Sequence, residues 1–375
     1  MIEGRAVPYL RVANVFDGYI DFSDINQMPF KQREIETFRL RPGDILLNEG
    51  QSVELVGRCA MYADGPEDCC FQNTLIRYRA GPETDANFAI QLFRYCQAIG
   101  IFSRIAVKTN SIAHLGVSRF AELELPFPPL PEQRKIAEIL RTWDEVIEKL
   151  EALRAAKERR LDGVSQRLLA PSRAVGHGVP RSNWAATSFG EVFDERQDKN
   201  ANLGPDDVIT VGKYAIRKQS EHFTRSVASK DLSNYWTISP GDFVYDPMSA
   251  YYGAIGRFSG STDGIVSPAY RVIRLHPDVD HKFMVALLRT HHIRFLLETR
   301  SSQGNKEGKR RLLQRDEFES IEFKLPPIQT QREIAAQIAV FRAELDLTDR
   351  EIQALTRQKR GLMQKLLTGE WRVAV

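Results

Sequence analysis

One stretch of the sequence occurs twice, 198 positions apart, and this repeat constrains the fold more than any other feature. The first copy reads "FPPLPEQRKIAEIL" (127–140) and the second reads "LPPIQTQREIAAQI" (325–338). Further matches keep nearly the same spacing: "RPGDIL" (41–46) with "SPGDFV" (239–244), "VGR" (56–58) with "IGR" (255–257), and "GVSQRLL" (163–169) with "GLMQKLL" (361–367). A register kept over such distances indicates a tandem duplication.

Each copy ends in a long amphipathic segment that predicts a helix. Apolar residues recur there at steps of three, four or seven over about five heptads, a pattern that is typical of a coiled coil. Only Lys157, Thr348 and Lys359 interrupt the apolar seam. Prolines precede both segments, where a helix can begin but not continue. The predicted seam comprises Ile136, Leu140, Trp143, Ile147, Leu150, Leu161, Val164, Leu168, Ile334, Ile338, Phe341, Leu345, Ile352, Leu355, Leu362 and Leu366.

The rest of each copy predicts a mixed domain. Stretches such as "QNTLIRYR" and "AYRVIRL" alternate like strands between Gly/Pro turns, and short helices are predicted around 87–96 and 282–298. The predicted fold class is α+β, with two mixed α/β domains separated by two long antiparallel coiled-coil helices related by a pseudo-two-fold axis. The expected boundaries are a first domain 1–127, a central helix 128–170, a linker 171–183, a second domain 184–325 and a C-terminal helix 326–375.

The two copies differ at their front. The second copy begins near Trp184, which implies that the first lacks about fifteen equivalent residues. Each predicted helix of about 36 residues would rise about 54 Å. If two such helices pair antiparallel, they would hold the two mixed domains at a fixed separation.

Composition bounds the function only loosely. The 375 residues carry 52 Lys and Arg against 49 Asp and Glu, a net charge of +3, so any basic surface must be local. No apolar run approaches the roughly 20 residues that cross a bilayer, and "MIEGRAVPYL" has no secretory core, so we expect a cytoplasmic protein without a membrane partner. The four cysteines and seven histidines match no metal motif, so we expect buried thiols and no metal site.

Catalytic motifs matter here because an enzyme is the main alternative to a non-catalytic binding protein. The stretch "YDPMSAYYG" (245–253) lacks the second proline of an amino-methyltransferase loop. "PD" (277–278) and "EGK" (307–309) share only residue types with a restriction-type metal site. "SSQGNKEGKRR" is one residue short of a phosphate-binding loop and follows no predicted strand. We therefore expect no catalytic residue on this chain.

Polar loops of both copies are the candidates for contact with a ligand such as DNA. The stretch 299–315 has six basic residues and one acidic residue, and its alternative interpretation is a merely solvated charged loop. Arg and Lys neutralise phosphates or pair with guanine, while Gln and Asn address adenine. The candidates there are Ser302, Gln303, Asn305, Lys306, Lys309, Arg310 and Arg311. The equivalent stretch 102–115 offers Arg104, Lys108, Thr109 and Asn110.

A second pair of loops follows the "PGD" turns. "NEGQSVELVGR" (48–58) and "DPMSAYYGAIGR" (246–257) occupy matching positions but differ in nearly all their side chains. Gln51, Ser52, Tyr251 and Tyr252 are candidates for contact with a DNA groove, and packing is the alternative for the tyrosines.

Taken together, the duplicated motifs resemble the specificity (S) subunit of type I restriction–modification enzymes. The motifs that carry the resemblance are "PPLPEQRKIAEIL" and its degenerate second copy, "PYLRVANVFDGYID", "PGDILLNEG", "GIVSPAYRV" and "QKLLTGEW", and they span essentially the whole chain. The sequence departs from the family's pattern in the short front of the first domain and in Thr330, where the first copy has Glu132.

The resemblance implies a function. In that family each mixed domain is a target-recognition domain that reads one half of a split site in double-stranded DNA. The helices set the spacing and dock two methyltransferase (M) subunits, and motor-nuclease restriction (R) subunits join for cleavage. No cofactor is then expected on this chain, while S-adenosylmethionine, ATP and magnesium belong to the partners. A stand-alone two-headed DNA-binding or architectural protein is the alternative, and a fused nuclease is a third hypothesis.

Overall fold

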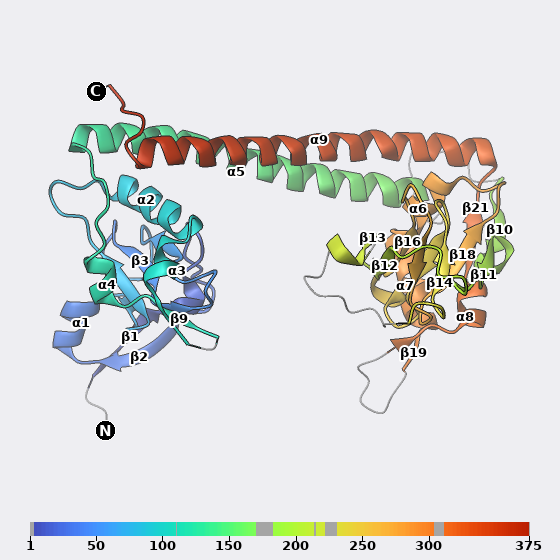
Figure 1. Ribbon diagram of the computed structural model, residues 1–375, viewed down its shortest axis with the longest axis horizontal. Coiled ribbons are helices and arrows are strands. Elements are labelled where there is room, and N and C mark those ends of the chain that lie inside the picture. The colour runs from blue at the N-terminus through green and yellow to red at the C-terminus, as the bar shows by residue number, and fades with distance from the viewer. Residues whose placement is uncertain are drawn as a thin grey trace. The chain divides into compact units, whose positions relative to one another are not determined.

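The computed structural model describes residues 4–109, 111–169, 183–213, 215–221, 231–303 and 311–374. The chain divides into two compact units: unit 1 comprises Met1–Ala152 with Arg350–Val375, and unit 2 comprises Leu153–Asp349. Each unit contains one mixed part, called here head 1 (residues 4–127) and head 2 (residues 183–325). Each unit also contains a stretch of the two long helices α5 (Leu130–Leu169) and α9 (Ile328–Leu367) (Figure 1).

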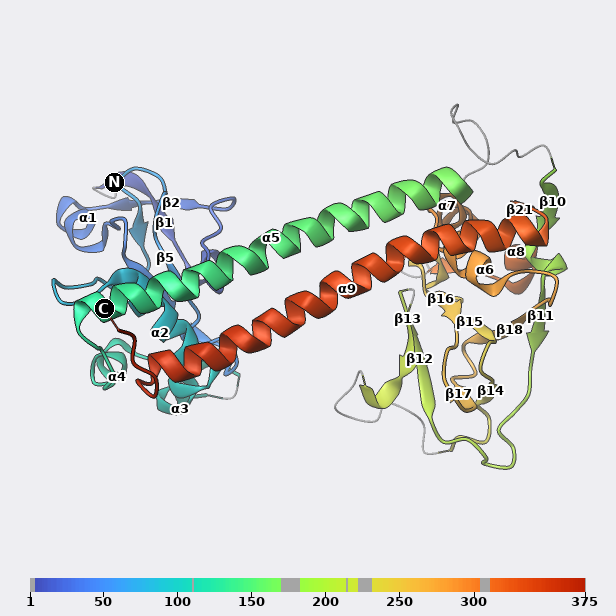
Figure 2. The same cartoon turned by 90° about the horizontal axis from the view of Figure 1, so that it is seen from above.

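Helices α5 and α9 begin at matched positions and end at matched positions of the repeat. In unit 1 the start of α5 packs on the end of α9, with Ile136 and Leu140 in the same core as Leu366. In unit 2 the end of α5 packs on the start of α9, with Leu168 against the core that holds Ile334. The helices are therefore antiparallel within each unit, and Figure 2 shows them side by side.

The residues of the predicted apolar seam all lie on the packed face of these helices. Ile136, Leu140, Ile334, Ile338 and Leu366 are buried, at 5% exposure or less. The others are half-buried, as expected for two paired helices that each bury one stripe. These half-buried residues are Trp143, Ile147, Leu150, Leu161, Val164, Leu168, Phe341, Leu345, Ile352, Leu355 and Leu362.

The polar residues that interrupt the seam have partners. In unit 2 the Lys157 ammonium donates a hydrogen bond to the Thr348 hydroxyl at 2.9 Å. In unit 1 Lys359 forms an ion pair with Asp144. A polar pair inside an apolar seam costs stability but specifies the register of the two helices, because a shifted alignment would bury both groups unpaired.

Head 1 is built from small sheets and short helices. Its sheet orders are β2-β1-β6, β5-β3-β7 and β4-β9-β8. The strands are β1 (Arg5–Leu10), β2 (Asn26–Phe30), β3 (Ile45–Asn48), β4 (Gly50–Gln51), β5 (Cys59–Met61), β6 (Cys70–Phe71), β7 (Leu75–Tyr78), β8 (Val107–Lys108) and β9 (Ala113–His114). The helices are η1 (Val12–Asn14), α1 (Gln32–Phe38), α2 (Ala86–Ala98), α3 (Ile101–Ile105) and α4 (Val117–Ala121).

Head 2 has larger sheets, in the orders β11-β18-β15-β16, β13-β12-β17-β14, β10-β21 and β19-β20. The strands are β10 (Ala185–Ser188), β11 (Phe193–Arg196), β12 (Val208–Gly212), β13 (Ala215–Lys218), β14 (Trp236–Ile238), β15 (Phe243–Tyr245), β16 (Ile255–Arg257), β17 (Gly264–Val266), β18 (Arg271–Leu275), β19 (Ser302–Gln303), β20 (Arg311–Leu312) and β21 (Glu322–Leu325). The helices are η2 (Phe189–Glu191), η3 (Gln219–Glu221), η4 (Ala250–Tyr252), α6 (His281–Leu288), α7 (His291–Arg300) and α8 (Arg315–Glu319).

The helix predicted around 282–298 is in fact two helices, α6 and α7. The break falls at Thr290, whose side-chain oxygen accepts a hydrogen bond from the Ile293 backbone N–H at 3.3 Å and so caps α7. Threonine favours helix starts because its side chain satisfies a backbone donor that the first turn leaves open.

The two heads share one topology. The order β5-β3-β7 of head 1 matches β16-β15-β18 of head 2, and β2-β1-β6 matches β13-β12-β17. In both heads the second set combines one antiparallel and one parallel pairing. The predicted α+β fold class, with a repeated mixed domain and long helices, is therefore confirmed.

The N-terminal segment of head 2, with strands β10 and β11, has no counterpart in the described part of head 1. Strand β10 pairs with β21, and β11 pairs with β18 at the edge of the main sheet. In head 1 the segment that corresponds to β21 is not a strand, and Pro126 stands at the position of Lys324. Since proline lacks a backbone N–H, it cannot donate in a ladder like that of β21.

Each "PGD" turn holds a buried aspartate against an arginine. Asp44 accepts two hydrogen bonds from Arg79, both at 2.6 Å, and Asp242 accepts one from Arg274 at 3.0 Å. The glycine before each aspartate has a positive φ, 91° at Gly43 and 102° at Gly241, a conformation that other residues adopt at a cost. The motif is thus explained by packing of the turn and not by ligand contact.

A buried glutamine joins head 1 to its helix. The Gln133 amide donates to the backbone carbonyls of Glu83 at 3.0 Å and Pro128 at 2.8 Å. Its Oε1 accepts from the backbone N–H of Asp85 at 2.8 Å. Asp85 in turn caps α2, accepting from the Phe88 N–H at 3.0 Å. One side chain thus ties together the start of α5, the turn before α2 and the start of α2.

Unit 2 repeats this junction with the matching residues. Gln331 donates to the Pro326 carbonyl and accepts from the Asp280 N–H, both at 2.8 Å, and Asp280 caps α6. Both glutamines are 1% exposed. The repeated double-proline and glutamine motif is therefore explained by this clamp, because the first proline supplies the carbonyl that the glutamine binds.

The segment after α9 is anchored on Glu132 of unit 1. Arg372 donates from Nε to Glu132 Oε1 at 2.8 Å and from a terminal guanidinium nitrogen to Glu132 Oε2 at 2.6 Å. The Val373 N–H also donates to Glu132 Oε1, at 3.0 Å. These hydrogen bonds lower the pKa of Glu132 from 4.5 to about 2. Thr330, the matching residue of unit 2, could not form such an ion pair, so this contact accounts for the divergence at that position.

We predict that Gln331→Leu lowers the stability of the full chain by roughly 2 to 4 kcal/mol, because a buried backbone donor and a buried acceptor lose their partner. Urea unfolding measures the change. The matched control is Gln329→Leu, at an exposed position in the same helical turn. Equal effects of the two substitutions would contradict the clamp.

We predict that Glu132→Gln removes part of the acid dependence of stability. Because the folded-state pKa is depressed, Glu132 stabilises the fold above about pH 4.5 and loses this contribution as the pH falls toward about 2. Thermal unfolding of both proteins between these pH values should therefore converge at the acid end. Glu145→Gln, on the exposed face of α5, serves as the control, and parallel curves for Glu132→Gln and the parent would contradict the prediction.

Candidate nucleic-acid interface

In head 1 the two candidate loops form one small sheet. Strand β4 lies at the start of the loop 48–58, and β8 and β9 form a hairpin in the stretch 102–115. Gln51 pairs with Ala113, which pairs on its other side with Lys108. The structure therefore brings Gln51 and Lys108 onto the same sheet, and Lys108 is exposed.

In head 2 the equivalent loops meet through side chains. The Arg311 guanidinium lies 5.4 Å from the centre of the Tyr251 ring and 2.9 Å from a Glu298 carboxylate oxygen. The Tyr252 ring packs edge-on against Tyr251, with ring centres 5.3 Å apart, and is 41% exposed. Arg311 is thus partly neutralised and serves as an anchor for the hairpin, while Tyr252 remains available to a ligand.

The same backbone hydrogen bond holds the paired loops in both heads. The Leu115 N–H donates to the Glu49 carbonyl at 2.8 Å, and 198 positions later the Leu313 N–H donates to the Pro247 carbonyl at 2.9 Å. Both leucines are fully or almost fully buried. The position of each hairpin against its neighbouring loop therefore depends on main-chain atoms and a buried leucine, and not on the side chains that differ between the heads.

Several predicted contact residues have local structural roles. The Thr109 hydroxyl donates to the Ile112 carbonyl at 2.9 Å, and the Ser302 hydroxyl donates to the Leu312 carbonyl at 3.1 Å, so each closes its own hairpin. The Ser52 carbonyl accepts from two N–H groups of the following turn. Arg104 donates to the Ile99 carbonyl at the end of α2, although its side chain is exposed.

Other predicted residues fall outside the described parts of the chain. These are Asn110, Asn305, Lys306, Lys309 and Arg310, and for Gln303 only the backbone is described, where it pairs with Arg311.

Sequence reasoning missed two exposed side chains at the interface. His114 pairs with Gly50 beside Gln51, and its Nδ1 lies 3.3 Å from a Glu49 carboxylate oxygen. Met248, 42% exposed, lies in the turn before Tyr252. The strand alternation of β9 and the matching positions of the two loops are the signals that would have pointed to them.

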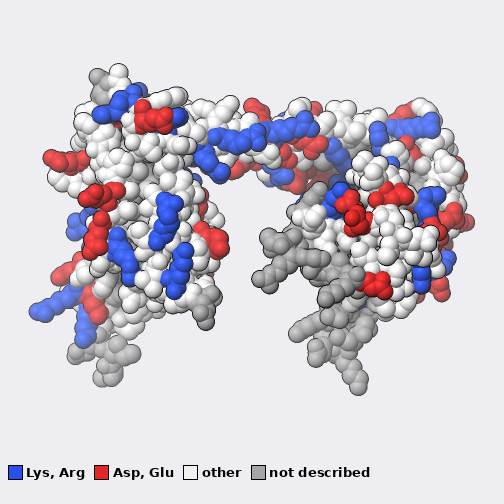
Figure 3. All heavy atoms as spheres, in the orientation of Figure 1, with Lys and Arg blue, Asp and Glu red and all other residues white. Residues whose placement is uncertain are grey.

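Charge is distributed locally on the visible surface. Figure 3 shows Lys and Arg side chains along the long helices and over head 1, interspersed with Asp and Glu. On this face the two signs of charge are mixed, in agreement with the small net charge of +3.

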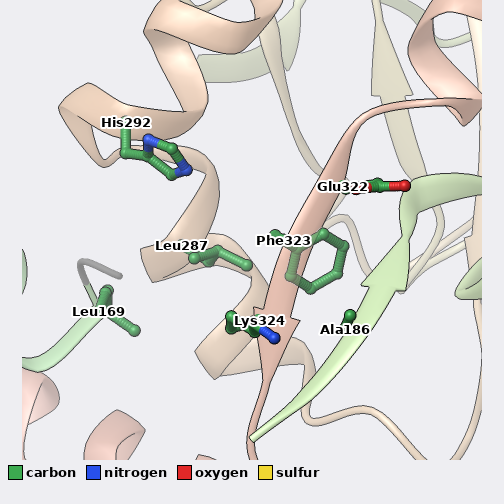
Figure 4. A pocket seen from close by; sticks show the side chains of 7 residues that line it. All are labelled: Leu169, Ala186, Leu287, His292, Glu322, Phe323 and Lys324. Carbon is green, nitrogen blue, oxygen red and sulfur yellow. The ribbon is translucent and has the colours of Figure 1, made fainter. Parts of the chain in front are cut away.

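A cavity of about 310 Å³ in unit 2 lies beside the β10–β21 pair and is lined largely by apolar side chains such as Leu169, Leu287 and Phe323. In Figure 4 His292 and Glu322 lie on opposite sides of it. Burial lowers the pKa of His292. The cavity thus brings together no acid and base that could act on one substrate.

The described ranges contain no site that is suited to metal binding or to redox chemistry. Within them no group of three or more His, Cys, Asp or Glu side chains has an arrangement that could hold a metal ion. The four cysteines are buried, and burial raises the pKa of Cys96 to about 12, which disfavours a reactive thiolate. Among the helices described here, none is long and apolar enough to span a membrane.

Comparison with known proteins gives matches that share one description. Residues 3–157 match the family model described as the type I restriction modification DNA specificity domain. A protein of Methanocaldococcus jannaschii described as "putative type I restriction enzyme MjaX specificity subunit" is 23% identical over 399 residues, covering 98% of this chain and 87% of the relative. The MjaVIII specificity subunit of the same organism is 24% identical, covering 72% of this chain and 68% of the relative.

Solved structures are similar along nearly the whole chain. A structure reported under the heading of complex assembly and conformational transition of the type I R-M system covers 98% of this chain and 93% of its own, with a TM-score of 0.59 and 16% identity. The type I restriction–modification S subunit from M. genitalium covers 98% and 90%, with a TM-score of 0.51 and 17% identity. At these identities the similarity concerns the fold.

We predict that Lys108→Ala weakens binding of duplex DNA and lowers the slope of log affinity against log salt concentration by about 1, the value for one lost phosphate contact. Fluorescence titration at several salt concentrations measures this slope. Lys31→Ala, another exposed lysine of head 1, is the control. An unchanged slope for Lys108→Ala would remove this residue from the interface.

Proposed function

We propose that this chain, a type I restriction–modification specificity subunit as its sequence predicted, reads a bipartite DNA site with one half at each head. The match of residues 3–157 to the family's DNA specificity domain supports the assignment of head 1. The repeated topology supports the same role for head 2. Two heads that are related but not identical suit two different half-sites at a fixed separation.

The observation that carries this proposal is the contrast between a shared loop frame and divergent side chains. The Leu115–Glu49 and Leu313–Pro247 backbone hydrogen bonds hold the loops alike in both heads. Over that frame head 1 presents Gln51 and Lys108, and head 2 presents the aromatic Tyr252. A reader of two different sequences needs this combination, because base contacts must differ while their scaffold stays in place.

The long helices would carry the second part of the function, the docking of two methyltransferase subunits. Outside the seam, both helices expose apolar side chains: Val340 and Leu347 of α9 are 58% and 62% exposed, and Val146 and Leu153 of α5 are 43% and 45% exposed. Exposed apolar side chains on a helix that already buries another face support a partner surface. On this proposal the core complex contains two M subunits and one S subunit, and R subunits join for cleavage.

The chemistry would then belong to the partners. We propose that the chain itself is non-catalytic and acts in the cytoplasm, while the M subunits bring S-adenosylmethionine and the R subunits bring ATP and magnesium. The resemblance of the duplicated motifs to the family's specificity subunit supports this division.

Methylome sequencing of cells that express the chain with its methyltransferase partner tests the proposal. We expect methylated adenines in a split motif, two short defined sequences separated by a fixed number of unspecified bases. A continuous methylated motif would contradict two-headed reading. Failure of any adenine methyltransferase to co-purify with the chain would instead favour a stand-alone DNA-binding protein.

A further inference from the structure

In unit 2 one segment of the chain covers two strand edges of the head. Strand β10 (Ala185–Ser188) pairs with β21, and β11 pairs with the side of β18 that faces away from β15. Between these two strands, the Phe189 ring packs on Phe318 and Phe323, with ring centres 4.9 and 5.1 Å apart. The segment 184–196 therefore completes two backbone ladders and also covers an apolar surface.

The repeat places both edges in unit 1 as well. Helices α4 and α8 match at a spacing of 198, so residues 123–127 correspond to residues 321–325 of β21. Strand β7 corresponds to β18, because each pairs in the same register with the strand that follows a "PGD" turn. In the described part of the chain, no strand pairs with residues 123–127, and β7 is the last strand of its sheet.

The backbone groups that face β10 in unit 2 have counterparts without a partner in unit 1. The residue that follows β10 donates its N–H to the Ile321 carbonyl at 3.0 Å. Because such pairs alternate along an antiparallel ladder, Phe323 and Leu325 also direct their backbone groups toward β10. Their counterparts, Leu125 and Phe127, form no backbone–backbone hydrogen bond within the described ranges.

Pro126 does not prevent such pairing in unit 1. It matches Lys324, which lies between the two residues that face β10 and therefore directs its own backbone groups away from that strand. Residues 123–129 also run without a helix, turn or bend. The segment is thus an open edge that retains the backbone donors of a ladder like that between β10 and β21.

The apolar side chains of this edge are less covered than their counterparts. Ile321 is 1% exposed, whereas Leu123 at the matching position is half-buried. Phe323 is 6% exposed, whereas Leu125 is half-buried. Phe127, at the end of the row, is 40% exposed. A row of uncovered apolar side chains beside backbone donors without a partner is suited to an added strand.

Space for a large side chain exists at the end of the edge. Phe127 lines two hollows, with volumes of about 560 and 200 Å³, and the smaller one extends to Leu366 at the end of α9. In unit 2 Trp184, the residue before β10, is buried in the core against which Leu325 packs. Unit 1 is therefore hollow at the position where unit 2 holds an indole ring.

We propose that residues 123–127, with the outer side of β7, bind an extended segment of a docked methyltransferase subunit, which adds a strand as residues 184–196 do in unit 2. This inference rests on the proposed function, since it requires that partner. The occupant must pair with the backbone of the edge and fill the hollows at Phe127, so it is an alternating segment with aromatic side chains.

The position and the charge of the edge favour the methyltransferase subunit over DNA. The edge continues directly into α5, and one of its hollows reaches α9, so it is contiguous with the helices of the proposed docking surface. Its exposed charged residues, Glu122 and Glu124, are acidic and would repel a phosphate backbone. The two units would then hold their methyltransferase subunits through different contacts.

Amide hydrogen exchange of the full chain, with and without the co-purifying methyltransferase subunit, tests the site directly. The N–H groups of Leu125 and Phe127 should exchange roughly 10-fold more slowly or better in the complex, since pairing in a ladder protects a backbone amide. The matching residues 321–325 are the internal reference, because β10 pairs with them in the free chain.

A synthetic peptide with the sequence of residues 183–197 is a second probe. It should bind the edge and displace one of the two methyltransferase subunits, whereas the same peptide with Phe189→Ser and Phe193→Ser should not. In the full chain, Phe127→Ser should weaken binding of one methyltransferase subunit about 10-fold, as expected for an aromatic anchor. Phe295→Ser, at an exposed phenylalanine of α7, is the matched control and should bind like the parent.

The outcomes separate this inference from the proposed function. If the complex forms with neither amide protection nor displacement by the peptide, the inference alone is overturned. Protection that arises from self-association of the chain, measured by sedimentation, would make a second copy the occupant and would also overturn it. Protection by duplex DNA without the methyltransferase would do the same. A parent chain that binds no methyltransferase would overturn the proposed function itself.

Discussion

The amide of one buried glutamine in each unit fixes how a head continues into its helix. Gln133 and Gln331 each satisfy a proline carbonyl before the long helix and the N–H of an aspartate, Asp85 capping α2 and Asp280 capping α6. An amide is suited to this position because it donates and accepts at once and carries no charge that burial would penalise. Loops of the head keep a defined orientation to the helices only while this junction is rigid.

The apolar periodicity predicted the two long helices. It did not predict features that depend on single polar side chains, such as a helix break or a polar pair in the seam. Heptad spacing predicted the presence and the packed face of α5 and α9, since apolar repetition depends only on helix geometry, although each helix has 40 residues where about 36 were predicted. The break at Thr290 was missed because a capping hydroxyl inside an apolar stretch gives no periodic signal. Pairing of Lys157 with Thr348 was equally hidden, because the two residues lie 191 positions apart and meet only in the fold.

Contact of the candidate loops with DNA stays a prediction, whereas the structure shows local roles for several of their side chains. Matching positions in the repeat identified the two loops of each head, and the structure joins them. The sequence could not show that the Thr109 and Ser302 hydroxyls are bonded within their own hairpins, or that Arg311 is held by Glu298. Such contacts depend on side-chain direction, which alternates along a strand and is set by hairpin geometry that spacing alone does not determine.

The main-chain bonds at Leu115 and Leu313 have a consequence for how such a protein changes over generations. Because the loop frame is held by backbone atoms and a buried leucine, substitutions at the exposed loop positions leave that frame satisfied. On the proposed function, a head could thus acquire a new preference through substitutions that leave this frame intact. Duplication would extend this freedom, because either head could change while the other still reads its half of the site.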